Sequence, residues 1–456
     1  MRIQVHDFSG HPFQAELSRE LAARGHSVDH VYSTQYGSGK GTLERTAADS
    51  EQLSFSPLTA KQPFQKYSAV GRIRFERSYS AAWLAHTKET VPDCVVACNV
   101  PLFALADFRR AAARRGLPWV LWHQDLFSNA ISEELGRKLP GAAAGTGGAL
   151  VRRIEAGVVS GARQVVAIGE EFRQAYRQWG LDTGHVTIIP NWAPIDEITP
   201  RPRDNAWSAT HLPHEGELRL LYAGTLGRKH NPLLLGALLR ESLSAGLPVR
   251  LIVASEGEGI DMLREDLARE PELPVTLLPF QPAADLPEML GSADVLVTIL
   301  EPGASRFSIP SKVLSSLAAG RPILGLMPED NPAADDIKEA SGFVGPPTDY
   351  GVAAAVGWLR RLDEDPAAAK AAGARGRRIA ENRFGIGPIA DRFEAVLKHA
   401  VAGLPGAPAG LAERRAADFP VGLAEAAAQQ SNGVPPRVRP AHAAAPGLRD
   451  VPRKVS

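Results

Sequence analysis

The sequence has very few cysteines and no long hydrophobic run. Its only two cysteines, Cys94 and Cys98, lie in an apolar stretch, where they are typical of reduced thiols in a buried strand rather than of a disulfide framework. No uninterrupted stretch approaches the ~20 apolar residues that a membrane-spanning helix needs. The first residues, Met1 to Asp7, also lack the apolar segment of a signal peptide. We therefore expect a cytoplasmic protein.

The chain also lacks net charge and a complete dinucleotide fingerprint. Lysine plus arginine and aspartate plus glutamate both number 51, so no global field favours nucleic acid, and phosphate recognition must be local. The turn at residues 256–259 has two glycines but no third one, and its two acids would repel a pyrophosphate, which argues against a nicotinamide cofactor. The acidic run at residues 363–365 is typical of a solvated helix end, so no metal is expected.

Strands and helices alternate in the first part of the chain. At 456 residues the chain exceeds the roughly 250 to 300 at which one hydrophobic core stops growing, so two domains are expected. A strand at 3–8, a glycine turn, a helix beginning near Pro12 and a strand at 28–32 indicate a right-handed crossover in a parallel sheet. The same alternation continues with strands at 95–100, 119–122, 165–168 and 186–189 and helices at 103–115 and 149–159. Residues 34–90 give no clear pattern.

A second series of strands follows, at 218–223, 251–254, 275–278, 295–299 and 323–327, each separated by a helical pattern. The predicted fold is therefore α/β, with two Rossmann-like domains facing each other across a cleft. The predicted divisions are a first domain at 1–192, a linker at 193–217, a second domain at 218–387, a helix crossing back at 388–402 and a disordered tail at 403–456.

Two segments of the second domain are suited to binding a phosphate. Gly224, Thr225, Arg228 and Lys229 follow the strand at 218–223, and open α/β sheets bind ligands at the carboxyl ends of their strands. Glycine allows a close approach of the backbone, and the two cations could neutralise a diphosphate as its negative charge grows. The alternative is a solvated basic turn.

The second segment is Pro310-Ser311-Lys312, which precedes an apolar helix that ends at Gly320. Ser311 is a good N-cap residue, and the free N–H groups of the helix, its dipole and Lys312 together favour an anion. The alternative is a simple helix cap.

The chain resembles glycosyltransferase family 4, and in particular its bacterial surface-polysaccharide branch of WbuB-like and WcaI-like enzymes, over about residues 1 to 400. The segments that carry the resemblance are 6–14 with Gly25-His26, Gln124-Asp125-Leu126, Ile189-Pro190-Asn191-Trp192, 224–232, and 310–312 through 318–322. The resemblance implies a GT-B fold with an acceptor domain first and a donor domain second, and a retaining reaction that needs no metal or other cofactor. It also implies a nucleotide-sugar donor, expected to be UDP-linked, and a lipid-linked oligosaccharide acceptor in surface polysaccharide biosynthesis.

The family usually has two glutamates eight positions apart around this helix, one near the donor sugar and one on the ribose. This sequence has Phe307 and Ser315 at those positions. Glu301, at the end of the preceding strand, is a candidate substitute, or an ordinary loop carboxylate. We still expect Ser315 to bind the donor, but the sequence does not indicate which part of the donor it contacts.

The resemblance also assigns residues of the first domain to the reaction. Gly10 and His11 lie at the first strand-to-helix turn, where the family's glycine-rich loop approaches the donor phosphates; the alternative is turn geometry alone. His123 and Asp125 follow another strand and are predicted to be catalytic together with Lys229, although either could only hold a loop.

Phe280, Gln281 and Gly257 are expected to line the site of the nucleotide base. A basic helix around Arg109, together with apolar residues in 130–159, could contact the anionic inner face of the cytoplasmic membrane. The alternative is an ordinary helix exposed to solvent.

Two other functions remain open at this point. A nucleotide-sugar 2-epimerase would share the fold and the phosphate site but need no acceptor. A catalytically silent nucleotide-sugar-binding protein would fit the loss of both family glutamates.

Overall fold

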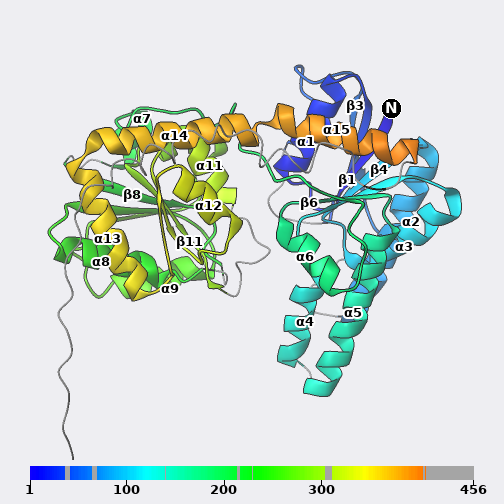
Figure 1. Cartoon of the computed structure of the whole chain (residues 1–456), viewed down its shortest axis with the longest axis horizontal. Helices are drawn as coiled ribbons and strands as arrows, with labels where there is room; N and C mark the ends of the chain where they lie inside the picture. Colours follow the sequence, from blue (N-terminus) through cyan, green and yellow to red (C-terminus); the bar gives the residue numbers. More distant parts are fainter. Residues whose placement is uncertain are drawn as a thin grey trace, which may run out of the picture. The chain divides into compact units, whose positions relative to one another are not determined.

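The computed structural model describes residues 1–35, 42–63, 69–138, 140–212, 216–227, 230–302, 311–403 and 406. The tail predicted at 403–456 lies outside these residues, apart from Gly403 and Gly406. The described part contains two parallel sheets with helices packed around each, which confirms the predicted α/β class (Figure 1).

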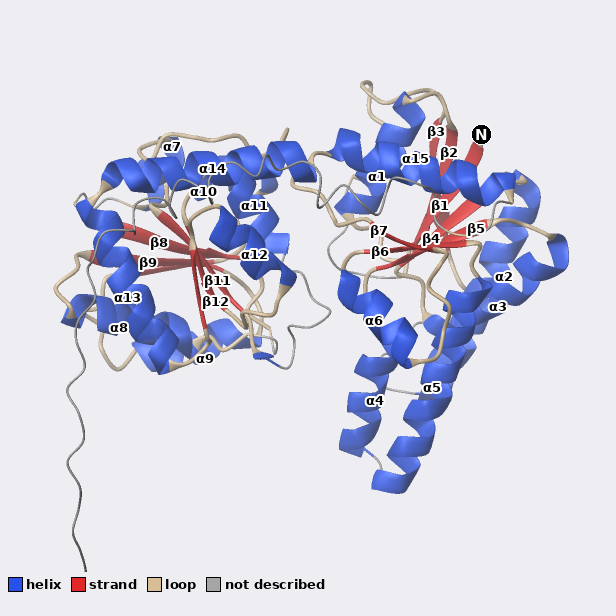
Figure 2. Ribbon diagram, viewed as in Figure 1, coloured by secondary structure: helices blue, strands red, loops and turns tan. Residues whose placement is uncertain are grey.

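The first sheet has seven parallel strands in the order β3-β2-β1-β4-β5-β6-β7. The central strands are buried along their whole length, because helices cover both faces (Figure 2). Cys94 and Cys98 are both free and buried in β4, as predicted. The strands are β1 (Arg2–Asp7), β2 (Ser27–Ser33), β3 (Leu53–Leu58), β4 (Cys94–Cys98), β5 (Trp119–His123), β6 (Gln164–Ala167) and β7 (Val186–Ile188).

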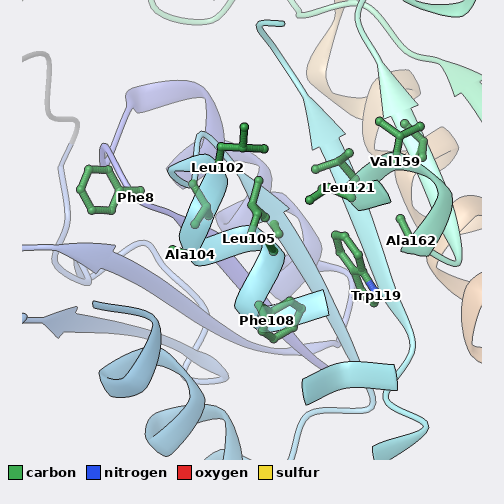
Figure 3. Close-up of a cluster of buried hydrophobic side chains, with 14 of the residues drawn as sticks. Phe8, Leu102, Ala104, Leu105, Phe108, Trp119, Leu121, Val159 and Ala162 are labelled. Carbon is green, nitrogen blue, oxygen red and sulfur yellow. The ribbon is translucent and has the colours of Figure 1, made fainter. Parts of the chain in front are cut away.

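Aromatic residues fill one face of this sheet. Trp83 stacks on Phe108 with ring centroids 3.9 Å apart, and Trp119 meets Phe108 edge-on. Figure 3 shows Phe108 and Trp119 among the buried side chains of this cluster. The helices around the sheet are α1 (Pro12–Ala23), α2 (Ala69–Thr90), α3 (Leu102–Arg115), α4 (Phe127–Lys138), α5 (Gly141–Gly161) and α6 (Glu170–Gln178).

The sequence did not predict four of these elements and predicted one too short. Strand β3 and helix α2 fall in residues 34–90, where no pattern was clear, and neither α4 nor α6 was predicted. Helix α5 begins at Gly141 rather than at residue 149, and it pairs with α4 in an antiparallel hairpin (Figure 1). The first turns of α5 are rich in glycine and alanine, so they carry no apolar periodicity for a sequence analysis to detect.

The second sheet has six parallel strands in the order β10-β9-β8-β11-β12-β13. They are β8 (Leu218–Ala223), β9 (Val249–Ala254), β10 (Val275–Leu278), β11 (Val295–Ile299), β12 (Ile323–Leu326) and β13 (Phe343–Gly345). Its helices are α8 (Leu233–Ser244), α9 (Glu258–Leu267), α10 (Leu286–Gly291), α11 (Ser311–Ala319), α12 (Pro332–Glu339), α13 (Asp349–Glu364) and α14 (Pro366–Phe384).

The segment predicted as a linker packs closely against the second sheet. It contains a short helix, α7 (Ala206–His211), which Asn205 begins with a capping box closed by Ser208. Trp207 and Leu212 are buried in the same hydrophobic cluster as helix α11. The described part of residues 193–217 is therefore ordered against the second sheet.

The last described helix, α15 (Ile386–Ala402), returns to the first sheet as predicted. Helix α14 packs against α11 beside the second sheet, and α15 packs against α1 and β5. Phe393 of α15 is fully buried, with its ring 4.8 Å from that of Trp122. Arg24, the C-cap residue of α1, donates to the Gly387 carbonyl at 2.8 Å and pairs with Asp391.

Candidate functional site

A cavity of about 220 Å³ opens at the carboxyl ends of the central strands of the second sheet. Ala223 and Gly224 end β8 here, Ala254 ends β9, and helices α10 and α11 complete the lining. Leucine and methionine side chains provide most of the apolar lining. Six residues that the sequence predicted to bind the donor meet in this cavity, namely Gly224, Phe280, Gln281, Ser311, Lys312 and Ser315.

Lys312 lies at the beginning of α11 and points back toward the end of β8. Its Nζ atom donates to Tyr222 Oη at 2.6 Å and to the Thr225 carbonyl at 3.3 Å, and it lies 4.6 Å from the centre of the Tyr222 ring. Burial lowers the pKa of Lys312 to about 8, because the charged form loses hydration. A bound anion would stabilise the charged ammonium, because it would compensate for the hydration that burial removes.

Gly224 allows the lysine to lie close to the strand end. Its φ of +124° is one that residues with a side chain rarely adopt. A Cβ atom added there would lie 2.4 Å from Lys312 Cε. The glycine at this position therefore leaves room for the lysine side chain, whereas its predicted close approach to a ligand phosphate stays a prediction.

Helix α11 is described from Ser311 onward, so Ser311 lies within the helix and is not the N-cap residue that the sequence predicted. The first N–H groups of a helix have no partner within the helix, which makes this end suited to an anion. Ser315 follows one turn later on the same helix and also lines the cavity.

Phe280 and Gln281 follow β10 on another side of the cavity. Phe280 is 45% exposed, so its ring is accessible to a ligand. The Gln281 side chain is already engaged, because its Oε1 accepts from Trp207 Nε1 at 3.2 Å and its Nε2 donates to the Pro279 carbonyl at 3.0 Å. A base at this position would therefore meet the Phe280 ring and the backbone.

Five predicted donor residues that the structure describes do not line the cavity: Gly10 and His11 of the first sheet, and Thr225, Gly257 and Glu301. Thr225 contributes its carbonyl to Lys312 while its side chain is exposed. Gly257 precedes α9 with a φ of +110°, and a Cβ there would lie 2.9 Å from the Leu226 carbonyl oxygen, so it lets two loops pack together. Glu301 follows the end of β11 and is half-buried. Arg228, Lys229 and Pro310, and also Phe307, lie outside the described residues.

Gly10 and His11 form the turn between β1 and α1 of the first sheet. Gly10 has a φ of +73°, and His11 is the N-cap of α1. The buried Asp7 side chain shapes this turn, because it accepts from the His11 backbone N at 2.5 Å, from Ser9 N at 3.3 Å and from Asn99 Nδ2 at 3.0 Å. Burial raises the pKa of Asp7, although these hydrogen bonds oppose the shift.

His123 and Asp125 follow β5, and their environments differ. His123 is buried, with Nδ1 2.6 Å from Tyr176 Oη and Nε2 3.3 Å from Glu155 Oε1. Asp125 is exposed. Glu155 of α5 also accepts from the backbone N of Phe127 at 2.7 Å and of Ser128 at 2.9 Å, so it fixes both ends of the segment between β5 and α4.

Several residues of these sites were not predicted from the sequence. Asp7 lies in the segment 6–14 that carries the resemblance but was given no role of its own. Tyr222 belongs to a predicted strand that gave no functional signal, and Glu155 lies in an ordinary helix pattern. Glu16 of α1 is another, since it accepts from Trp192 Nε1 at 2.6 Å and burial raises its pKa to about 7. Trp192 belongs to a quoted motif and was the one available pointer to Glu16.

The described part of the chain shows no group of three or more His, Cys, Asp or Glu residues placed to hold a metal ion. Within the same residues, every helix is too short or too polar to pass through a bilayer.

Residues 11–192 match the family model of the glycosyl transferase 4-like domain. The probable glycosyltransferase WbjE of Pseudomonas aeruginosa is 25% identical over 259 residues, which are 56% of this chain and 63% of that protein. The chain thus aligns with less than two thirds of the length of this relative.

Two solved structures share the fold. Sucrose-phosphate synthase from Thermosynechococcus elongatus superposes with a TM-score of 0.66 at 16% identity, covering 88% of this chain and 99% of that one. HepE of Anabaena, solved in complex with UDP and glucose, gives 0.64 at 17% identity and covers 87% and 99%. These comparisons confirm the resemblance to family 4 and the two-sheet fold that it implied.

Proposed function

From the glycosyl transferase 4-like domain at residues 11–192, we propose that this chain is a glycosyltransferase that takes a sugar from a nucleoside diphosphate. The observation that carries the proposal is the cavity at the end of β8, where Ser311 and Lys312 of α11 meet four other predicted donor residues. In this proposal the diphosphate lies against Lys312, and the base lies beside Phe280. UDP is the preferred nucleotide, since a structure with the same fold was solved with UDP and glucose bound.

The cavity places a cation and N–H donors where the departing nucleotide would develop negative charge. As the bond between the sugar C1 and the β-phosphate oxygen breaks, the electron pair stays on the phosphate and its negative charge grows. Lys312 and the helix N–H groups are fixed in advance near that charge, so they stabilise the transition state more than the bound donor. Arg228 and Lys229, which follow the same strand, are proposed to add positive charge.

The other half of the reaction needs an acceptor hydroxyl. Its oxygen forms the new bond to C1 on the face that the nucleotide leaves, and its proton passes to the departing phosphate oxygen, so the configuration is retained. We assign the acceptor side to the first sheet, where His123 and Asp125 follow or end β5, and we keep Gly10 and His11, which follow β1, as residues that approach the donor phosphates.

The proposed acceptor is a lipid-linked oligosaccharide, which would place the enzyme in the cytoplasm against the inner membrane face. The α4–α5 hairpin supports a membrane contact, because Leu150 is 60% exposed and Arg152 and Arg153 are exposed beside it. Sedimentation with anionic vesicles tests this contact, with neutral vesicles and the Leu150→Glu variant as controls. Equal sedimentation with both vesicle types would contradict it.

Calorimetric titration with UDP, GDP, ADP and their sugar donors tests the donor site. We expect micromolar binding of one nucleotide, unchanged by a chelator and lost in Lys312→Ala, because the variant leaves the diphosphate without its buried cation. Lys338→Ala is the matched control, since Lys338 is exposed and pairs only at the surface with Glu329. The absence of binding by every nucleotide would refute the proposed site.

An assay of turnover distinguishes a glycosyltransferase from an epimerase and from a catalytically silent binding protein. A transferase releases nucleotide only when an acceptor is present, apart from slow hydrolysis. An epimerase would change the donor sugar without any acceptor, and a silent binding protein would do neither. Extracted membrane lipids and a labelled donor are the substrates for this assay.

A further inference from the structure

The winding of the first sheet reverses between β1 and β4. From β1 the chain passes to β2 on one side, whereas β4 lies on the other side of β1 and pairs with β5. In open parallel sheets, ligands bind outside the carboxyl ends of the two strands where the winding reverses. Asp7 ends β1, and Asn99 directly follows Cys98, which ends β4 and lies opposite Asp7. Asp7 and Asn99 therefore lie at the edge where this sheet is expected to bind a ligand.

Asn99 has an unusual backbone conformation and a fixed side chain. Its φ is +53°, in the left-handed region that few residues other than glycine adopt, and such conformations cluster at binding and active sites. Its Nδ2 atom donates to Oδ1 of the buried Asp7 at 3.0 Å. A carboxylate oxygen only accepts, so the nitrogen of the amide faces Asp7 and the amide oxygen is directed elsewhere.

The amide of Asn99 keeps a hydrogen-bonding capacity that two neighbouring amides have used. Gln124 and Asn191 come after β5 and β7, and their amides bind each other, with N···O distances of 2.9 and 3.0 Å. Within the residues that the structure describes, no protein group donates to Asn99 Oδ1, and this oxygen is not buried. Of these three amides, that of Asn99 can therefore bind a further group through its oxygen and its second N–H.

We propose that Asn99 binds a hydroxyl group of the acceptor sugar. This inference rests on the proposed function and adds a residue to its acceptor side. A hydroxyl both donates and accepts, which matches an amide, whereas a phosphate is bound more strongly by a charged donor. Strand β4 lies between β1 and β5, so Asn99 comes between the turn of Gly10 and His11 and the exposed Asp125. Asn99 thus lies between residues assigned to the donor phosphates and a residue assigned to the acceptor.

Asn99→Gly tests the assignment, because glycine adopts the same φ and lacks the amide. Transfer from a labelled nucleotide sugar to extracted membrane lipids is compared with the slow hydrolysis of that donor, in which water replaces the acceptor. We expect kcat/KM for the lipid to fall about five- to tenfold, the usual effect of a lost hydrogen bond, while hydrolysis and UDP affinity stay unchanged. Ser341→Gly is the matched control, since Ser341 also has a positive φ, of +62°, but is exposed between α12 and β13.

Asn99→Asp is a second variant that tolerates a positive φ. Its additional oxygen would face the Asp7 carboxylate in place of an N–H, so we expect transfer to fall in this variant too. Unchanged transfer in either variant would overturn the inference, because Asn99 would then serve only the backbone. An equal loss of transfer and hydrolysis would also overturn it, since the defect would lie in donor binding or folding. If the wild type transferred no sugar to any lipid fraction, the proposed function would be refuted instead.

Discussion

The pKa of Lys312 makes donor binding depend on pH in a defined range. Burial lowers this pKa from 10.5 to about 8, which corresponds to a loss of about 3 kcal/mol for the charged form at about 1.36 kcal/mol per unit. A diphosphate bound beside the ammonium favours the charged form and raises the pKa again. Between pH 8 and 10.5 binding therefore takes up a proton, and affinity falls as the pH rises.

The size of this effect follows from the two pKa values. If the bound lysine returns to its ordinary pKa of 10.5, the dissociation constant for UDP is expected to be about eightfold higher at pH 9 than at pH 7.5. Below pH 8 the lysine is mostly charged in both states, so it contributes little there. Calorimetry in buffers with different heats of ionisation measures the uptake of protons directly.

Lys312→Arg is the control for this prediction. Arginine stays charged throughout the range, so any remaining pH dependence in the variant comes from the nucleotide or from other groups. The reasoning is refuted if wild type and variant show the same pH dependence, or if no protons are taken up at pH 9.

Three further predictions concern other positions. Gly224→Ala is expected to weaken UDP binding, since the new Cβ would lie 2.4 Å from Lys312 Cε and displace the flexible lysine side chain; calorimetry checks this, and an unchanged affinity would contradict the close packing. Phe393→Ala should lower the free energy of unfolding in urea by about 3–5 kcal/mol because the ring is fully buried, whereas Val401→Ala on the exposed side of α15 should change it little. Glu16 has a pKa raised from 4.5 to about 7, so the native state binds more protons than the unfolded state in this range and stability should fall as the pH rises through it. Glu16→Gln should remove that fall in urea titrations, and an identical pH profile in both proteins would speak against it.

The fold was largely predictable because parallel strands covered on both faces are continuous apolar runs. The strands at residues 119–122 and 295–299 were placed to within one residue for this reason. Helix α2 was not, since its exposed and buried positions carry a mixture of charged, small and aromatic residues. The short helix within residues 193–217 was not predicted for a related reason, because its order comes from a capping box and the burial of Trp207 against residues far away in sequence.

The site was predictable where the topology alone brings residues together. Gly224 and Gln281 follow parallel strands of one sheet, so their meeting at one edge follows from the strand order. The partners of Lys312 did not follow, because nothing local to Tyr222 or His230 indicates a lysine about 80 to 90 residues later in the chain. Such contacts depend on the side-chain directions that packing fixes.

The two residues predicted to be catalytic after β5 also differ in their packing. His123 has both ring nitrogens within hydrogen-bond distance of protein groups, Tyr176 and the buried Glu155, whose carboxylate is kept charged by its hydrogen bonds. A base must contact the proton that it removes, and a buried ring between two protein partners does not meet that requirement. Asp125 is exposed at the end of the same strand, in a segment that Glu155 holds through the backbone of Ser128. Of the two, only Asp125 is exposed, so its catalytic role stays a prediction that the burial of His123 does not oppose, and His123 and Glu155 fix the segment in which it lies.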